Sequence, residues 1–564
     1  MTRSRLLLLA LAFGAISTPV GLLADDRLGD QLGTVRFEVT GQPAARTHVI
    51  RGVKLLHHRM YPEADREFAR AAAIDPECAL AHWGRAMTLL HPLWPDAPNE
   101  TEIAEGTEHI RRGLACRSAT PRERAYLETL AAYFSDPANG DHAARLKAID
   151  VAAAAQADKF PDDLDAAAFS ALFHLAPARF QPKDKSHRLQ LEAAARLKAV
   201  LAKLPDHPGA QHYKIHAYDF PLLADRALEV CDTYSGIAPD VPHALHMPTH
   251  IFTRRGLWEK SIEFNRRSAE AARKLGDAAG ALNGHQPHAL DYLAYAYLQR
   301  GQYREAERVR TEIAALRGPY SQVQPTAMAF AFAAIPARCT LERQRWSEAA
   351  ALPLRQPAEF AWSDAYLNCD SIVRFARAVG AARSGQLETA RTEVAELERI
   401  HQKLLSSRRA SYWVSQAETQ LLAGRAWLRF AEGQADEAVA LMRRSAELEA
   451  NTDKEAVTPG EVLPAGDLLG DLLLETGKPA DALAAFEAVL GASPNRLNSL
   501  YGAGLAAERS GNSAQARRYY EQLLVVASAA DPAVERVEHA RKFLTGATSA
   551  SAIEPVAPRI ARSP

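Results

Sequence analysis

From about Arg46 to Phe543 the apolar positions recur at helical spacing, in a stretch rich in Ala, Leu, Glu and Arg. Gly and Pro interrupt the pattern at intervals, as they do between helices. Residues 33–41 (GTVRFEVTG) differ, because Val35, Phe37 and Val39 alternate with polar residues. This stretch predicts a short strand or an extended arm, since one such segment cannot form a sheet alone. The chain is therefore predicted to be all-α.

The helical pattern is an internal repeat. Residues 475–495 align with residues 508–528 at an offset of 34, which pairs Gly477 with Gly511 and Phe486 with Tyr520. This is the period of the tetratricopeptide helix-turn-helix unit. Related phrases recur at 59–76, 255–272, 300–310, 343–352, 384–394 and 432–442, with longer spacings in the middle of the chain. We predict tetratricopeptide-like helix-turn-helix repeats stacked into a right-handed α-solenoid.

These patterns divide the chain into five parts. We predict a signal peptide at 1–24, an extended N-terminal arm at 25–45, a repeat array with a histidine cluster at 46–320, a second array at 321–545, and a disordered Ala/Ser/Pro-rich tail at 546–564.

Composition limits the cell compartments and the classes of partner that are expected for this chain. The formal net charge is −1, with 67 basic against 68 acidic residues, so no nucleic-acid partner is expected. Arg3 and Arg5 precede the apolar run from Leu6 to Ile16, which is the pattern of a secretory signal. We therefore expect export to the periplasm or the extracellular space, without stable membrane insertion after cleavage. An uncleaved anchor is the alternative. The 5 scattered cysteines exclude a disulfide-built scaffold.

Histidine is the residue type that suggests chemistry, because seven of the 19 fall between His212 and His288. His212 and His216 are spaced i,i+4 and share one helix face. His246 and His250 repeat that pair at an offset of 34 residues, on the equivalent helix of the next unit. Neighbouring repeats could therefore direct imidazoles at one patch of the surface.

Imidazole at this spacing suits zinc, copper or iron. The candidate ligands are His212, His216, His246, His250 and His288, with His243, His285, Asp219 and Asp291 as additional ligands or supporting groups. HYKIH at 212–216 places Tyr213 where the zincin motif has its general-base Glu, so a zincin protease is rejected. There is also no G-x-S-x-G elbow.

Prolines favour an ordinary structural role for the same residues. Pro242, Pro248 and Pro287 place these histidines at helix starts, where a ring can cap backbone groups or join a buried hydrogen-bond network. Pro248 also interrupts the helix that would align His243, His246 and His250 on one face. A capping network, a metal site and metal-free proton transfer all stay open.

Two long phrases resemble a known family. CALAHWGRAMTLLHPLW (78–94) and PHALHMPTHIFTRRGLWEKSIEFNRRS (242–268) resemble exported bacterial tetratricopeptide-repeat proteins, in which an HPLW helix and an HAxHMPSHIF segment recur. The arm LGTVRFEVTGQP is also similar, although Gly41 and Gln42 stand where the family often has a cysteine. The resemblance covers about residues 30–540 and implies a tetratricopeptide-like helical domain without a settled activity. It carries over His91, Trp94, His243, His246, His250 and Trp258.

Two functions follow as hypotheses. The first is an exported solenoid that binds a peptide or protein on its concave face, with His91, Trp94, Tyr213 and Tyr292 as candidate groove residues. The second is a metal-binding protein or metalloenzyme, a hydrolase or an oxidoreductase, whose histidine cluster is shared between adjacent repeats. The oligomeric state and the identity of any ligand are not determined by the sequence.

Overall fold

The computed structural model describes residues 28–94, 97–134, 141–180, 184–321, 324–407 and 411–546. The predicted signal peptide and residues 547–564 of the predicted tail lie outside the described residues.

Helices account for the regular structure of the described chain. The first part contains α1 (Pro43–His57), α2 (Tyr61–Ile74), α3 (Ala79–Met87), α4 (Glu100–Ala115), α5 (Pro121–Phe134), α6 (His142–Lys159), α7 (Leu164–Leu175), α8 (Arg188–Lys203), α9 (Pro208–Tyr218), α10 (Leu228–Ile237), α11 (Pro242–His246) and α12 (Pro248–Arg254). The second contains α13 (Trp258–Ala279), α14 (His285–Gln299), α15 (Tyr303–Ala315), α16 (Pro325–Leu341), α17 (Trp346–Ala350), α18 (Leu367–Arg383), α19 (Leu387–Ser406), α20 (Ser411–Ala431), α21 (Ala435–Ala450), α22 (Ala465–Glu475), α23 (Pro479–Ala492), α24 (Leu497–Arg509), α25 (Ser513–Val526) and α26 (Glu535–Leu544). Short 3-10 turns are η3 (Ala176–Phe180), η4 (Ala224–Ala227) and η5 (Asp364–Tyr366).

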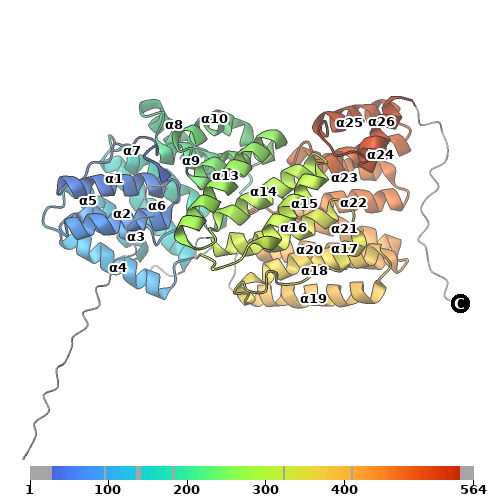
Figure 1. Ribbon diagram of the computed structural model, residues 1–564, viewed down its shortest axis with the longest axis horizontal. Helices are drawn as coiled ribbons and strands as arrows, with labels where there is room; N and C mark the ends of the chain where they lie inside the picture. Colours follow the sequence, from blue (N-terminus) through green and yellow to red (C-terminus); the bar gives the residue numbers. More distant parts are fainter. Residues whose placement is uncertain are drawn as a thin grey trace, which may run out of the picture.

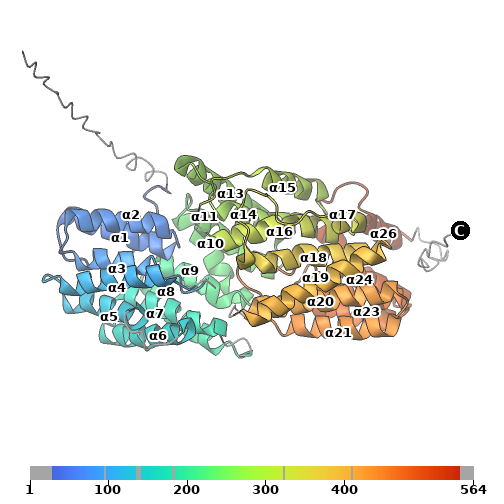
Figure 2. The same cartoon turned by 90° about the horizontal axis from the view of Figure 1, so that it is seen from below.

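Consecutive helices pack as hairpins, and helices two apart also touch, as in α14 with α16 and α18 with α20. This double contact stacks one hairpin on the next. Figures 1 and 2 show α1–α9 at one end of the elongated molecule, α18–α26 at the other, and α13–α16 between them. The prediction of an all-α solenoid of tetratricopeptide-like repeats is confirmed.

The segment before α1 is an extended arm rather than a strand. Within the described residues the β-structure is limited to an isolated bridge between Leu282 and Tyr320. The arm is held by single hydrogen bonds, such as Thr34 N to Asp206 O at 3.2 Å. Phe37 anchors it to the core, with its ring centroid 5.5 Å from that of Trp83.

The turn inside a hairpin requires a left-handed residue at its centre. Gly is used there in most repeats, and these glycines have φ between 63° and 84°: Gly256, Gly301, Gly385, Gly433, Gly477 and Gly511. Two repeats place a larger residue at the corresponding turn, Arg59 at φ 59° and Gln344 at φ 54°. A left-handed conformation costs an L side chain roughly 1–2 kcal/mol, so these two positions stand out.

The apolar core consists of a few large clusters along the solenoid. One cluster runs from Leu28 to Phe252, and the next begins at Ala269 and runs to Ala506. The packing thus changes near the start of α13, before residue 320, the predicted end of the first array. The boundary between the arrays stays a prediction.

The last repeats fold back onto the middle of the chain. Trp258 Nε1 donates to the carbonyl of Asn495 at 2.8 Å, and Asp531 N donates to the carbonyl of Gly301 at 3.0 Å. Arg496 is fully buried and donates to Tyr295 Oη at 2.6 Å and to Glu342 Oε1 at 2.7 Å. These contacts close part of the solenoid on itself.

Two further expectations concern covalent links and the membrane. All five cysteines are buried and carry reduced thiols. Among the described residues, none of the helices combines the length and the apolar character that crossing a membrane requires.

Candidate metal centre

Four helices of the solenoid bring the clustered histidines together. α9 supplies His212 and His216, α11 supplies His243 and His246, α12 supplies His250, and α14 supplies His288. Pro208, Pro242 and Pro248 begin the first three of these helices, where their missing N–H costs nothing. The rings point into the protein interior, and His212 is completely buried.

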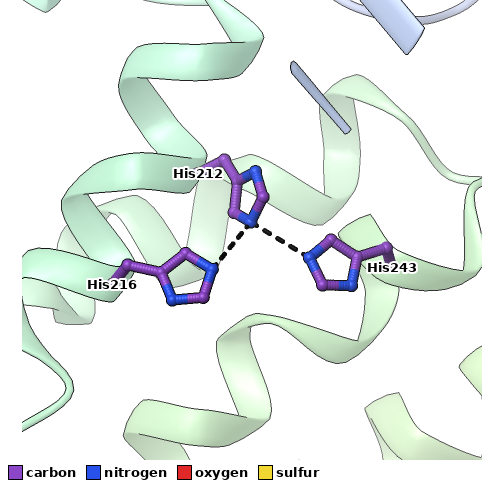
Figure 3. Close-up of side chains that lie close together, drawn as sticks. All are labelled: His212, His216 and His243. Carbon is purple, nitrogen blue, oxygen red and sulfur yellow. Dashed lines mark hydrogen bonds between the residues drawn. The ribbon is translucent and has the colours of Figure 1, made fainter. Parts of the chain in front are cut away.

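The first histidine set consists of His212, His216 and His243. His212 Nε2 lies 3.1 Å from His216 Nε2 and 3.0 Å from His243 Nε2, as Figure 3 shows. One ring nitrogen of each residue lies within 4.8 Å of the other two. Two nitrogens bound to one zinc ion at 2.0–2.1 Å and a tetrahedral angle would lie about 3.3 Å apart, so this spacing suits a shared ion.

The second histidine set consists of His246, His250 and His288, and it meets the same criterion. His246 Nε2 and His250 Nε2 are 3.0 Å apart. The two sets adjoin, because the ring centroids of His216 and His250 lie 6.2 Å apart and those of His243 and His246 lie 6.4 Å apart.

Hydrogen bonds on the outer side of these rings determine which nitrogen carries the proton. His212 Nδ1 lies 2.6 Å from the carbonyl of His57, which can only accept. His250 Nδ1 lies 2.9 Å from a carboxylate oxygen of Asp219. In both rings the hydrogen is therefore on Nδ1, and a neutral ring presents the lone pair of Nε2 to the interior.

His246 is oriented in the same way by Asn265. The side-chain amide of Asn265 donates to the carbonyl of Ser261 at 2.8 Å, which leaves its Oδ1 facing His246 Nδ1 at 2.8 Å. His246 therefore also carries its hydrogen on Nδ1. The Nε2 atoms of His246 and His250 thus face each other at 3.0 Å with no hydrogen between them, an arrangement that needs a cation to become favourable.

A proton is a poor candidate for that cation. Burial disfavours the imidazolium form and lowers the pKa of His246 well below 6.5, and the neighbouring His288 and His250 lower it further. Burial also lowers the pKa of His250, although Asp219 opposes the change. At neutral pH both rings are neutral, which is the form that ligates a metal ion.

Asp219 is an anionic support rather than a ligand. Although burial works against ionisation, Lys454 and Arg254 hold the pKa of Asp219 well below its usual value. Arg254 Nε donates to Asp219 Oδ1 at 2.8 Å, while the other oxygen accepts from His250. A carboxylate behind a metal-binding imidazole is a common arrangement in metalloproteins.

Both histidine sets open onto one cavity of about 70 Å³. His216 and His243 line it from the first set, and His250 and His288 from the second. The other lining residues are Arg59, Leu93, Trp94, Met247, Gln324, Thr326, Ala327, Trp413, Glu455, Ala456 and Val457.

The remaining predicted site residues lie around this centre or outside it. Asp291 accepts from Arg338 Nε at 3.0 Å and belongs to neither histidine set. His285 accepts from Gln324 Nε2 at 2.9 Å, and its ring centroid is 5.5 Å from that of His243. The five principal candidates are therefore divided between two sets, and His243, a secondary candidate, belongs to the first.

The proposed groove residues have other positions. Tyr213 and Tyr292 are buried in the interior, and Tyr292 packs against His246 with ring centroids 4.7 Å apart. The rings of His91 and Trp94 lie 4.8 Å apart, and Trp94 lines the cavity beside the histidines.

A third group, His57, Asp165 and His207, is a partly completed hydrogen-bond network, because Asp165 Oδ2 and His207 Nε2 are buried without a hydrogen-bond partner. His207 Nδ1 accepts from Ala210 N at 3.2 Å, so its Nε2–H faces Asp165 Oδ1 at 3.3 Å. His57 Nε2 donates to the same oxygen at 3.1 Å and its Nδ1 accepts from Tyr213 Oη at 2.9 Å. Both ring nitrogens of His57 are therefore hydrogen-bonded, and the carbonyl of the same residue orients His212.

Sequence analysis missed several residues of the site. Arg59 and the loop at 451–464 are far from the histidine motifs in sequence, whereas Asn265 lies inside the phrase 242–268 but was not among the candidate residues. Arg59 left one signal, since it stands where other repeats have Gly at the hairpin turn.

A separate and larger groove lies among the C-terminal repeats. Its volume is about 1230 Å³, and residues of α15, α16, α22, α24 and the start of α26 line it. Tyr303, Trp346 and Tyr501 contribute aromatic surface, and arginines alternate with carboxylates along it.

Comparisons with known proteins concern the fold only. No protein-family model matches the chain, and no curated protein sequence matches it either. Among solved structures, the human IFIT1 dimer with PPP-AAAA is 14% identical with a TM-score of 0.35, and the match covers 89% of this chain and 100% of that chain. Yeast Tom70 is 9% identical with a TM-score of 0.33, covering 89% and 95% respectively. Likeness at this level is no basis for transferring a function.

Proposed function

We propose that this protein is a metalloprotein that holds two transition-metal ions side by side, one in each histidine set. The observation that carries the proposal is the pair His246 and His250, whose Nε2 lone pairs face each other at 3.0 Å while both Nδ1–H groups are engaged elsewhere. In the pair His212 and His216 the Nε2 atoms also face each other, at 3.1 Å, and Arg59 Nη1, which can only donate, lies 3.4 Å from His216 Nε2.

The ligand chemistry indicates the class of metal. Each set offers three neutral imidazoles and no carboxylate, which suits zinc, copper or iron and is unsuited to magnesium or calcium. Three protein ligands leave a coordination position for water or substrate, as in catalytic metal sites. An ion here would supply either an activated water or an electron-transfer centre.

Metal analysis of untagged full-length protein tests the proposal. After reconstitution with zinc or copper at neutral pH and removal of loose ions, about two ions per chain are expected. His246→Gln should lower this number to about one. His401→Gln is the matched control, because His401 is also buried but lies in α19 outside both sets. Fewer than about 0.1 ion per chain in the wild type would exclude the proposal.

Binding of a peptide or protein partner is a second candidate function. The 1230 Å³ groove favours it, because its aromatic and charged lining is typical of a recognition surface. If a partner uses this groove, Tyr501→Ala combined with Arg343→Glu should abolish its capture, whereas His246→Gln should not. Equal capture by the groove variant would contradict this function.

We also propose that the chain is exported, on the support of the charged and apolar pattern at its N-terminus. Cell fractionation of the tagged full chain should find it outside the cytoplasm, and replacing Leu8 and Leu9 by Arg should retain it inside. Cytoplasmic accumulation of the unaltered chain would count against export.

A further inference from the structure

Arg59 occupies a backbone conformation that its own side chain disfavours. It lies at the turn between α1 and α2 with φ 59°, where six other hairpins place Gly. A residue with a side chain in this conformation is strained, and such strain gathers at functional sites. Gln344 is the other side chain at an equivalent turn, which makes it a natural comparison.

The side chain of Arg59 reaches the histidine centre. Although it is charged, it is only 6% exposed, and its guanidinium lies 4.8 Å from the centroid of the Trp94 ring. Its Nη1 lies 3.4 Å from His216 Nε2, and it lines the 70 Å³ cavity together with His216, His243, His250 and His288. The strained turn thus delivers a positive charge to the cavity that both histidine sets share.

The charges around this cavity do not balance once metal is bound. The six imidazoles are neutral ligands, Glu455 is the one carboxylate among the residues that line the cavity, and Asp219 behind His250 is already paired with Arg254. Two divalent ions alone would bring about four positive charges into this buried site, which is unfavourable without compensating anions. The cavity has room for several water-sized groups, since each needs only about 10–15 Å³.

We infer that the cavity binds a small anion of a few heavy atoms, which occupies open metal positions and accepts hydrogen bonds from Arg59. The chemical class is an inorganic oxyanion, a short carboxylate or a similar small anion, because a cavity of this size excludes larger ligands. This inference rests on the proposed metal centre. Arg59 acts as the specificity residue, and its planar guanidinium can donate two parallel hydrogen bonds.

Azide is a suitable probe, because it is a small anion whose binding to copper(II) produces a charge-transfer absorption. The full-length protein loaded with copper(II) is titrated with azide, and a saturable new band is expected. In Arg59→Gly the dissociation constant should rise by about tenfold or more, because a charge-assisted hydrogen bond is lost. The copper content of each variant is measured in parallel, so that azide affinity is compared per bound copper ion.

Replacing Arg59 by Gly separates an effect on anion binding from an effect on the stability of the fold. Arg59→Gly installs the residue that other repeats use at this turn, so the Tm of the variant should hold. Gln344→Gly makes the same backbone change far from the cavity and should leave azide affinity unchanged. Arg59→Lys keeps the charge and should lose less affinity than Arg59→Gly.

The outcomes distinguish a failure of the metal centre from a failure of the anion site. If copper does not load, the metal centre itself is excluded. If about two coppers load but azide produces no band, or binds Arg59→Gly as tightly as the wild type, the anion site is excluded and the metal centre survives. Equal weakening in Arg59→Gly and Gln344→Gly would also overturn the role of Arg59.

Discussion

At the scale of single residues, the decisive feature is the position of one hydrogen atom on each imidazole. Spacing in the sequence predicted that His212 with His216, and His246 with His250, would share helix faces, and they do. It could not show that Nε2 is the inward nitrogen, because this depends on His57, Asp219 and Asn265, which lie between 19 and 155 residues away from their histidine partners. These histidines meet their hydrogen-bond partners only when the helices pack together.

Asn265 gives the sharpest test at this scale. Asn265→Leu removes the acceptor of His246 Nδ1–H, so the ring is free to place its hydrogen on Nε2. Metal affinity should fall by about 10–100-fold, measured by competition with a chelator. Asn265→Asp keeps an acceptor oxygen and should retain most of the affinity. If both variants bind metal like the wild type, the orienting role of Asn265 is wrong.

Buried histidines outside the metal centre predict the response to acid. Burial lowers the pKa of His58 to about 3 and that of His91 to about 4, whereas both titrate near 6.5 in the unfolded chain. The unfolded state therefore binds more protons, so the stabilising contribution is complete above pH 6.5 and is lost as the pH falls toward 4.

The low pKa of each of these two rings should lower the free energy of unfolding of the metal-free protein by on the order of a few kcal/mol at pH 4. The basis is about 1.4 kcal/mol per unit of pKa difference between the folded and unfolded states. Urea unfolding at a series of pH values measures this loss. The midpoint should change little between pH 8 and 7 and fall steeply below 6.5. A midpoint that is as high at pH 5 as at pH 7 would be inconsistent with neutral buried rings.

At the scale of elements, the division between the two histidine sets falls inside α11 and not at Pro248. α11 ends at His246 and α12 begins at Pro248, while Met247 between them keeps helical backbone angles. His243 joins the first histidine set, and His246 and His250 join the second. The three histidines do not form a single motif, but Pro248 is not what divides them, because His246 and His250 on either side of it belong to the same set. The 34-residue offset in the sequence identified the pair His212 and His216 and the pair His246 and His250. The third member of each set, His243 or His288, is not related to the other set by that offset.

The loop at 451–464 covers the centre from the C-terminal half. Tyr292 Oη donates to the carbonyl of Thr458 at 3.0 Å, and Arg338 donates to Thr458 Oγ1 at 2.8 Å and to the carbonyl of Glu461 at 2.6 Å. Ala456 and Val457 line the cavity itself. The loop is therefore expected to control how fast an ion leaves.

Arg338→Met should loosen this cover. Because it leaves Asp291 as a buried unpaired charge, it should destabilise the protein by about 3–5 kcal/mol and speed the transfer of metal to a chelator. Arg496→Met is the matched control, since Arg496 is equally buried and pairs with Glu342 and Asp467 away from the loop. Similar rates of metal loss in the two variants would show that the effect is global instability.

At the scale of the whole molecule, the repeat period predicted the solenoid, and the glycine phrases marked most of its turns. The closure of the chain was beyond prediction, because the contacts of Trp258 with Asn495 and of Arg496 with Tyr295 join residues more than 200 positions apart. This closure brings the loop at 451–464 over the histidine sets. In the sequence alone, the prolines beside the histidines favoured a capping or hydrogen-bonding role over a metal site.

Metal should stabilise the molecule as a whole, because the ligands come from helices of successive repeats. Free zinc at about 1,000 times its Kd would add about 4 kcal/mol to the free energy of unfolding. Calorimetry should therefore show a higher Tm with zinc than after chelation, and magnesium should give no shift. An unchanged Tm with zinc would mean that no ion binds the folded state preferentially.

The most direct measurement is anomalous X-ray diffraction from crystals of the metal-loaded protein, recorded above and below the absorption edge of the metal. Two anomalous peaks are expected. One should lie within about 2.0–2.2 Å of nitrogens from His212, His216 and His243, and the other within the same distance of nitrogens from His246, His250 and His288. Absence of both peaks, with the Nε2 atoms of His246 and His250 rotated apart or joined by a proton, would contradict the proposed metal centre.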